Sequence, residues 1–151
     1  MTSLKRIIQE GRVAVGIEAS DKAGALEAVA GLLCADSAPM DPKRLLSAIV
    51  AREALASTGI GEGIAIPHAL CDDIHETSLA VARLARPVDF GAQDSVPVDL
   101  VFMIAGSRDN ASQHLQLLSK LARMAHDPSF RKAAREAVDA PSLARLLRER
   151  E

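Results

Sequence analysis

The sequence predicts an α/β domain in which α-helices cover a β-sheet. Two periodicities alternate along the chain: every second residue apolar, typical of strands, and apolar residues three or four positions apart, typical of helices. The run 98–105 is almost wholly apolar, as expected of a strand covered on both faces. Strands mixed with covering helices indicate one layered architecture, and 151 residues suit a single domain spanning 1–151.

The strands are expected in four places. In the first, Val13, Val15 and Ile17 alternate with smaller or polar residues, which is the period of a strand with one buried face. The other three are expected at 64–66, ending at Pro67-His68, at 79–85 and at 98–105. The preceding segment 58–63 carries glycine at three alternate positions, so we expect neither regular helix nor regular strand there.

The helices are expected where the apolar spacing lengthens. From Asp21 the apolar residues follow helical spacing as far as Leu33. Asp41-Pro42 has the sequence of an N-cap followed by proline at the first helical position, which predicts a second helix running toward Arg52. Three more helices are expected at about 111–126, after Asp127-Pro128 and from near Pro141.

The composition limits the classes of function. The chain is 48% hydrophobic and 25% charged, which suits a packed core, and its net charge of −2 argues against nucleic-acid or anionic-membrane binding. No apolar run is long enough for membrane insertion, and the N-terminus lacks a signal-peptide stretch. Cys34 and Cys71 have no disulfide-framework spacing. We therefore expect a cytoplasmic protein.

The segment 52–68 carries the most chemical information. It is not a P-loop, because no Gly-Lys-Ser/Thr closes it, and it is not a dinucleotide fingerprint, because Ile64 stands where the third glycine belongs. Gly59, Gly61 and Gly63 would let backbone N–H groups approach an anion without a Cβ in the way. A histidine held rigidly by a preceding proline, as His68 is, suits a nucleophile.

Other side chains are candidates for the same site. Arg52 offers a planar, permanent charge for phosphate, although an arginine at a helix end often serves only the helix dipole. His114 lies on the apolar stripe of its helix. It is either a second imidazole of the site or a histidine of the core. Ser57 and Thr58 are weaker phosphate-binding candidates, since such residues are usually loop or cap residues.

A metal site is the competing interpretation. Residue types that ligate metals gather within eight positions, but their spacing matches neither a helical His-Glu-x-x-His site nor a paired-cysteine zinc site. We expect no metal and keep a metal-dependent hydrolase only as the remote alternative. The residues concerned are His68, Cys71, Asp72, Asp73 and His75.

The run 52–68 closely resembles the active-site signature of the enzyme IIA family of the phosphotransferase system, of the fructose, mannitol and nitrogen-regulatory type. The resemblance extends to 87–90, 97–102 and 114–122, and so covers nearly the whole chain. The core of the signature reads Ser57-Thr58-Gly59-Ile60-Gly61-Glu62-Gly63-Ile64-Ala65-Ile66-Pro67-His68.

This resemblance implies a mixed β-sheet flanked by α-helices on both faces. It also implies a phosphotransferase component without cofactor, in which His68 accepts a phosphoryl group from the phosphorylated carrier HPr as a tele-phosphohistidine. The group would then pass to a cysteine or histidine of a IIB partner or serve as a regulatory signal for a target protein. Arg52 and His114 match the family's arginine and second histidine.

The domain organisation leads us to expect one branch of the family. A free-standing domain is more similar to the nitrogen-regulatory branch, which acts in nitrogen and potassium metabolism, with a fructose- or mannitol-type uptake component as the alternative. Two positions depart from the family's pattern. Glu62 stands where asparagine is frequent and brings a negative charge near the expected site, and Ala69 replaces a frequent glycine.

Overall fold

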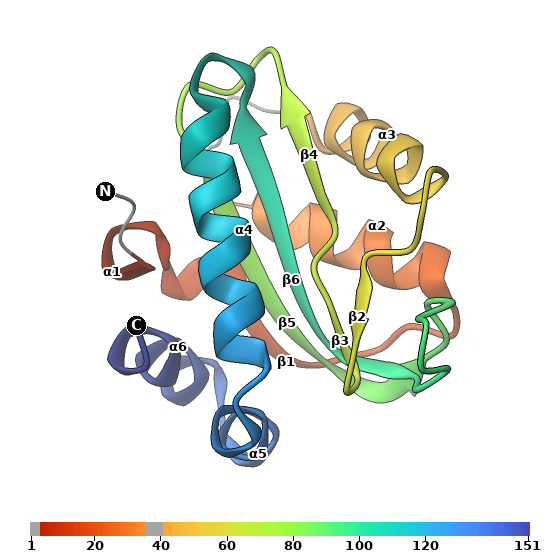
Figure 1. Cartoon of the computed structure of the whole chain (residues 1–151), viewed down its shortest axis with the longest axis vertical. Helices are drawn as coiled ribbons and strands as arrows, with labels where there is room; N and C mark the ends of the chain where they lie inside the picture. Colours follow the sequence, from red (N-terminus) through yellow and green to blue (C-terminus); the bar gives the residue numbers. More distant parts are fainter. Residues whose placement is uncertain (1–3, 36–40) are drawn as a thin grey trace.

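The computed structural model describes residues 4–35 and 41–151 (Figure 1). One mixed sheet of six strands has the order β1-β5-β6-β3-β2, and β4 also pairs with β6. The central pair β5–β6 is antiparallel, as is β2–β3, whereas β1 runs parallel to β5, and β3 and β4 run parallel to β6. The strands are β1 (Val13–Ile17), β2 (Gly59–Gly61), β3 (Ile64–Ala65), β4 (His68–Cys71), β5 (Ser78–Val88) and β6 (Val98–Ser107).

Helices cover both faces of this sheet, as expected. On one face lie α2 (Lys22–Leu33) and α3 (Pro42–Glu53), and the opposite face is covered by the short α1 (Leu4–Ile7) and by the last three helices (Figure 1). These are α4 (Ala111–Ala125), α5 (Pro128–Glu136) and α6 (Ala140–Glu149); two 3₁₀ turns, η1 (Glu10–Arg12) and η2 (Arg108–Asn110), precede β1 and α4. No helix in the described ranges is long and apolar enough to cross a membrane.

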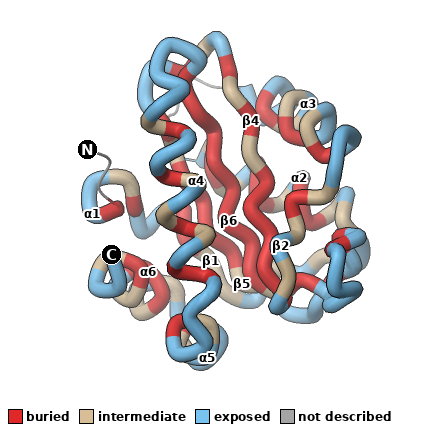
Figure 2. The backbone as a smooth tube through the Cα atoms, in the orientation of Figure 1, coloured by how far each residue is buried: buried red, intermediate tan, exposed pale blue. Residues whose placement is uncertain are grey.

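The core is divided in two by the sheet. Along β6, Val101 and Met103 pack with α2 and α3, whereas Phe102 and Ile104 pack with α4, α5 and α6. Every residue of β6 except Asp99 is buried, so the prediction of a strand covered on both faces is confirmed (Figure 2). The sheet, including β4, is therefore packed against helices on both faces through these two apolar layers.

Three of the predicted helices begin at the predicted residues, and each has an aspartate side chain as its N-cap. Asp21 accepts a hydrogen bond from Gly24 N (2.7 Å) before α2, and Asp41 accepts one from Lys43 N (3.0 Å) before α3. Asp127 caps α5 in the same way, with proline next to it at the first helical position. The aspartate-proline pairs thus mark the helix starts correctly.

The expectation of an irregular segment at 58–63 is wrong. Residues 59–61 form β2 and residues 61–63 make the turn of a β2–β3 hairpin, in which Gly61, Glu62 and Gly63 all have positive φ (95°, 59° and 79°). The alternate glycines supply this left-handed turn and do not prevent a strand. The strand expected to end at Pro67-His68 also continues, because β4 resumes the pairing with β6 after a break at Pro67.

Candidate active site

His68 is the first residue of β4 and is half-buried. Its Nδ1 lies 2.7 Å from the carbonyl oxygen of Ile66. Because a carbonyl can only accept, Nδ1 carries the proton in the neutral ring, and the lone pair is on Nε2. His68 is therefore oriented by its own backbone, with Nε2 as the nitrogen able to act as a nucleophile.

The Ile66 carbonyl is free to accept a hydrogen bond from His68. At the end of the β2–β3 hairpin, Thr58 and Ile66 form only one of the two backbone hydrogen bonds of an antiparallel pair. The register places Thr58 opposite Ile66, where an antiparallel ladder would exchange two hydrogen bonds. Only one forms, from Ile66 N to Thr58 O (3.0 Å). Thr58 N instead donates to Glu53 Oε2 (3.2 Å), which leaves the Ile66 carbonyl to His68.

Glu53, the last residue of α3, is a buried carboxylate that joins three elements. It accepts hydrogen bonds from the backbone N–H and the hydroxyl of Thr58, and Lys22 Nζ lies 2.6 Å from its Oε2. Lys22 also donates to the Phe90 carbonyl (3.2 Å). The carboxylate is thus paired as burial requires. Sequence reasoning assigned Glu53 no role, because nothing in its spacing shows that it turns inward.

His114 lies in the first turn of α4 and meets His68 in space. The two ring centroids are 5.5 Å apart, with the rings tilted by 53°. His114 is only 7% exposed, and its ring packs directly on the backbone of Gly106 in β6. A Cβ at Gly106 would stand 2.2 Å from His114 Nδ1, so only glycine leaves room for this ring. The structure therefore brings the two histidines together, and Gly106 is a residue that sequence reasoning missed.

The ring of His114 is neutral at physiological pH. Burial, and after it the neighbouring His68, lowers the pKa of His114 from 6.5 to about 4. Its Nδ1 is buried and has no hydrogen-bond partner in the described part of the chain. An N–H without an acceptor is costly to bury, so the proton belongs on Nε2, where it can be donated. His114 is thus a neutral hydrogen-bond donor beside His68.

This lowered pKa makes folding stability depend on pH. In the unfolded chain His114 binds a proton below about pH 6.5, whereas in the folded protein it binds one only below about pH 4. The free energy of unfolding should therefore decrease as the pH is lowered from about 6.5 to about 4, by up to about 3 kcal/mol from this group. Urea unfolding at about pH 7.5 and pH 4.5 measures the loss, and His114→Gln should lose less. Equal losses in both proteins would contradict the assignment.

Arg52 lies in the last turn of α3, which packs against β4. Its Nη1 donates to the carbonyl of Ala56 (3.0 Å), and none of the ion pairs among the described residues involves it. No hydrogen bond joins Arg52 to His68 in this part of the chain. The guanidinium therefore keeps a positive charge that no carboxylate of residues 4–35 and 41–151 neutralises.

The predicted phosphate-binding loop is engaged in other contacts. Ser57 Oγ donates to the Phe90 carbonyl (2.7 Å) and accepts from Gly59 N (3.0 Å), and the Thr58 hydroxyl donates to Glu53. A Cβ at Gly59 would stand 2.8 Å from that of Ala92. At Gly61 and Gly63 it would meet Asp94 Oδ2 at 3.1 Å and Arg135 Nη2 at 2.6 Å, respectively. These glycines permit close packing, and phosphate binding by the loop stays a prediction.

Glu62 sits at the hairpin turn and faces α5. Its carboxylate lies 3.7 Å from Arg131 Nη2, and its carbonyl accepts from Arg135 Nη2 (2.6 Å). Arg135 also forms a bidentate pair with Asp99 of β6, which ties the hairpin to α5. The negative charge of Glu62 thus lies near Arg131 of α5, while Arg135 binds the backbone of the same residue.

The two aspartates of the metal alternative have other partners. Asp72 Oδ1 lies 2.6 Å from Arg108 Nε, and Asp73 Oδ2 lies 3.6 Å from Arg44 Nη1. Cys71 is a buried free thiol whose pKa is raised by burial. Within residues 4–35 and 41–151, no three His, Cys, Asp or Glu side chains gather so as to hold a metal ion.

Comparison with known families identifies the family to which the chain belongs. Residues 6–150 match the family model described as the phosphoenolpyruvate-dependent sugar phosphotransferase system, EIIA 2. The chain belongs to this EIIA family. As an EIIA protein it is a phosphoryl carrier, and its fold is the one expected from the signature.

Relatives of this EIIA chain include nitrogen regulatory proteins and sugar-specific components. It is 35% identical over 147 residues to a nitrogen regulatory protein of Pseudomonas aeruginosa, with 97% of this chain and 96% of that protein covered. It is 36% identical over 128 residues to a fructose-specific EIIA component of Haloferax volcanii (85% and 83% covered). The crystal structure of the nitrogen regulatory protein IIA-Ntr from Neisseria meningitidis has a TM-score of 0.89 at 29% identity, covering 94% of this chain and 97% of that one.

Proposed function

We propose that the chain carries its phosphoryl group on Nε2 of His68, as a covalent phosphohistidine. The observation that carries this proposal is the 2.7 Å hydrogen bond from His68 Nδ1 to the Ile66 carbonyl. That bond fixes the orientation of the ring and leaves the lone pair on Nε2, as a nucleophile requires. No base is needed for the attack, because Nε2 of this tautomer has no proton to lose.

The phosphoryl donor in this proposal is an HPr-type carrier protein that itself bears a phosphohistidine. The bond from phosphorus to His68 Nε2 forms as the donor's N–P bond breaks, and the donor imidazole recovers its lone pair. Such transfer needs positioning and charge stabilisation more than covalent assistance. Arg52 supplies a permanent charge, and His114, whose ring centroid lies 5.5 Å from that of His68, supplies a neutral N–H donor. The proposal involves no cofactor.

The acceptor is a IIB component or a regulated target protein, and we propose regulation of the nitrogen type as the main role. The support is similarity over nearly the full length of a nitrogen regulatory protein, at 97% coverage of this chain. The second candidate, fructose uptake, is favoured by a fructose-specific component that is 36% identical over 85% of this chain. Phosphorylation of His68 would add roughly −1.5 to −2 charge at an accessible site, which can select between partners.

The carrier role is tested with phosphoenolpyruvate and a purified upstream relay that ends in HPr. Intact-mass analysis should find one acid-labile phosphoryl group, and peptide mapping should find it on the peptide that contains His68. Its location on another residue would refute the assignment to His68.

The regulatory role is tested by capture of partners on unmodified and phosphorylated protein. A regulator should bind a protein that is not a sugar permease, with an affinity that changes on phosphorylation. Recovery of IIB permease subunits alone would favour the fructose-type role and contradict regulation.

A further inference from the structure

A chain of hydrogen bonds leads from Glu53, at the end of α3, to the ring of His68. Thr58 N donates to Glu53 Oε2 (3.2 Å), and Ile66 N donates to the carbonyl oxygen of Thr58 (3.0 Å). The carbonyl oxygen of Ile66 in turn lies 2.7 Å from His68 Nδ1. Glu53, Thr58 and Ile66 are all buried. The chain therefore connects a buried carboxylate to the orientation of the His68 ring.

The carboxylate of Glu53 is held in place from two sides. Its Oε1 accepts from the hydroxyl of Thr58, so the carboxylate engages both donors of that residue. On the other side, Lys22 Nζ lies 2.6 Å from Oε2 and also donates to the Phe90 carbonyl (3.2 Å). The side chain of Glu53 is only 5% exposed, and these partners satisfy it as burial requires. Glu53 is thus fixed relative to α2 and to the loop after β5.

The residue before Thr58 is fixed by the same loop. Ser57 Oγ donates to the Phe90 carbonyl (2.7 Å) and accepts from Gly59 N (3.0 Å). Thr58 therefore lies between two residues whose positions are set by hydrogen bonds. Its N–H is directed to Glu53, although the hairpin register places Ile66 opposite it.

Without an acceptor at position 53, the backbone oxygen opposite the Thr58 N–H is that of Ile66, as in an ordinary antiparallel pair. A buried N–H is costly to leave unpaired, so it would turn to this oxygen. A carbonyl oxygen has two lone pairs, so Thr58 and His68 would share it, and the bond that fixes the His68 ring would weaken. The ring proton then also occupies Nε2, where it removes the lone pair that a nucleophile needs.

We propose that Glu53 is a positioning residue for phosphoryl transfer. By holding the backbone N–H of Thr58, it reserves the Ile66 carbonyl for His68 Nδ1 and so selects the tautomer with its lone pair on Nε2. The role in transfer rests on the proposed function of His68, whereas the selection of the tautomer does not.

The tautomer of His68 is measured by ¹⁵N NMR of the unphosphorylated protein at about pH 8, where the ring is neutral. The unsubstituted protein should show the proton on Nδ1. Glu53→Leu removes the acceptor, so the ratio of the two tautomers should move about tenfold toward the form protonated on Nε2. An unchanged ratio in folded Glu53→Leu would overturn the proposal.

Two smaller substitutions separate the reach of the side chain from its charge. Glu53→Asp keeps a carboxylate beside Lys22 but is one methylene too short for Thr58 N, so it should shift the tautomer as Glu53→Leu does. Glu53→Gln loses the charge but keeps an oxygen that accepts from Thr58 N, so it should retain the tautomer of the unsubstituted protein. A role in charge pairing alone predicts the opposite order, and that result would contradict the proposal. If Glu53→Leu fails to fold, this pair decides.

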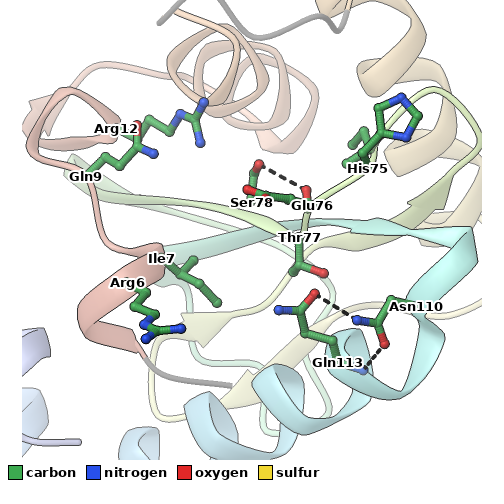
Figure 3. A pocket seen from close by; sticks show the side chains of 11 residues that line it. Arg6, Ile7, Gln9, Arg12, His75, Glu76, Thr77, Ser78, Asn110 and Gln113 are labelled. Atoms are coloured by element: carbon green, nitrogen blue, oxygen red, sulfur yellow. Dashed lines mark hydrogen bonds between the residues drawn. The ribbon is translucent and has the colours of Figure 1, made fainter. Parts of the chain in front are cut away.

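Glu76 provides the matched control. Figure 3 shows this exposed glutamate on the wall of a cavity beside the start of β5. In the described chain, that wall includes none of the residues that link Glu53 to His68. Glu76→Asp and Glu76→Leu should therefore leave the His68 tautomer unchanged. A shift equal to that of the Glu53 variants would show a general effect of losing a glutamate, against the proposal.

The rate of phosphorylation by the HPr relay is measured on the same proteins. In Glu53→Asp it should fall at least by the factor by which the fraction of His68 protonated on Nδ1 falls, and Glu53→Gln should keep most of the rate. An unchanged tautomer would overturn the positioning role even where His68 is phosphorylated. A tautomer that shifts as expected, in a protein that carries its phosphoryl group elsewhere, would instead overturn the proposed function and with it the role of Glu53 in transfer.

Discussion

Replacing His68 with alanine should abolish phosphorylation by the HPr relay completely. No other described side chain combines a free imidazole lone pair with a backbone bond that fixes the ring. His114 cannot substitute, because its ring is buried against Gly106 and its Nδ1 faces no partner in the described chain. Intact-mass analysis after incubation with the relay measures the loss. Since His68 is half-buried at the start of an edge segment, the variant should remain folded.

His126 provides the matched control for this substitution. It is an exposed histidine after the last turn of α4, so His126→Ala should be phosphorylated at the rate of the unsubstituted protein. Persistent phosphorylation of His68→Ala would place the phosphoryl group elsewhere and would remove the mechanism proposed above.

Replacing Arg52 with alanine should slow phosphoryl transfer in both directions, by about tenfold to a thousandfold. A charge that stabilises the moving phosphoryl group acts on the same transition state from either side, and removal of one such donor has effects of this order. Rapid-quench measurement of phosphorylation by HPr, and of the reverse transfer, provides the two rates.

Arg52→Lys is the comparison that separates charge from geometry. An ammonium group keeps the charge but cannot reproduce the planar fork, so it should restore only part of the rate. The hydrogen bond from Arg52 to the Ala56 carbonyl also stabilises the end of α3, so melting temperature must be measured beside the rates. A stable Arg52→Ala that transfers at the unsubstituted rate would exclude Arg52 from the site.

The elements with a strong local signal could be predicted from the sequence. Asp41 and Asp127, each before a proline, mark helix starts, and the apolar run of β6 marks a strand buried on both faces. The hairpin at 58–63 could not, because alternate glycines are equally compatible with a loop and with a left-handed turn between strands. Its pairing depends on Thr58 and Ile66, whose partners are set by tertiary structure.

The candidate site was predictable in its residues more than in its contacts. The signature predicts His68, Arg52 and His114 as site residues; the structure brings the two histidines together, and their roles stay predictions. Gly106 makes room for the His114 ring, and Glu53 is a buried, paired carboxylate. Neither role produces a pattern that can be recognised in a single sequence.

The hydrogen-bond acceptor that orients the His68 ring is a backbone carbonyl, and this affects how the orientation of the ring depends on pH. Many reactive histidines are held by a carboxylate, which becomes protonated in acid and then releases the ring. Here the acceptor is the carbonyl of Ile66, and a peptide oxygen does not titrate in any range where proteins stay folded. The same nitrogen therefore stays available at every pH at which the ring is neutral. Acidification therefore does not remove the acceptor that orients the His68 ring, as it would remove a carboxylate partner.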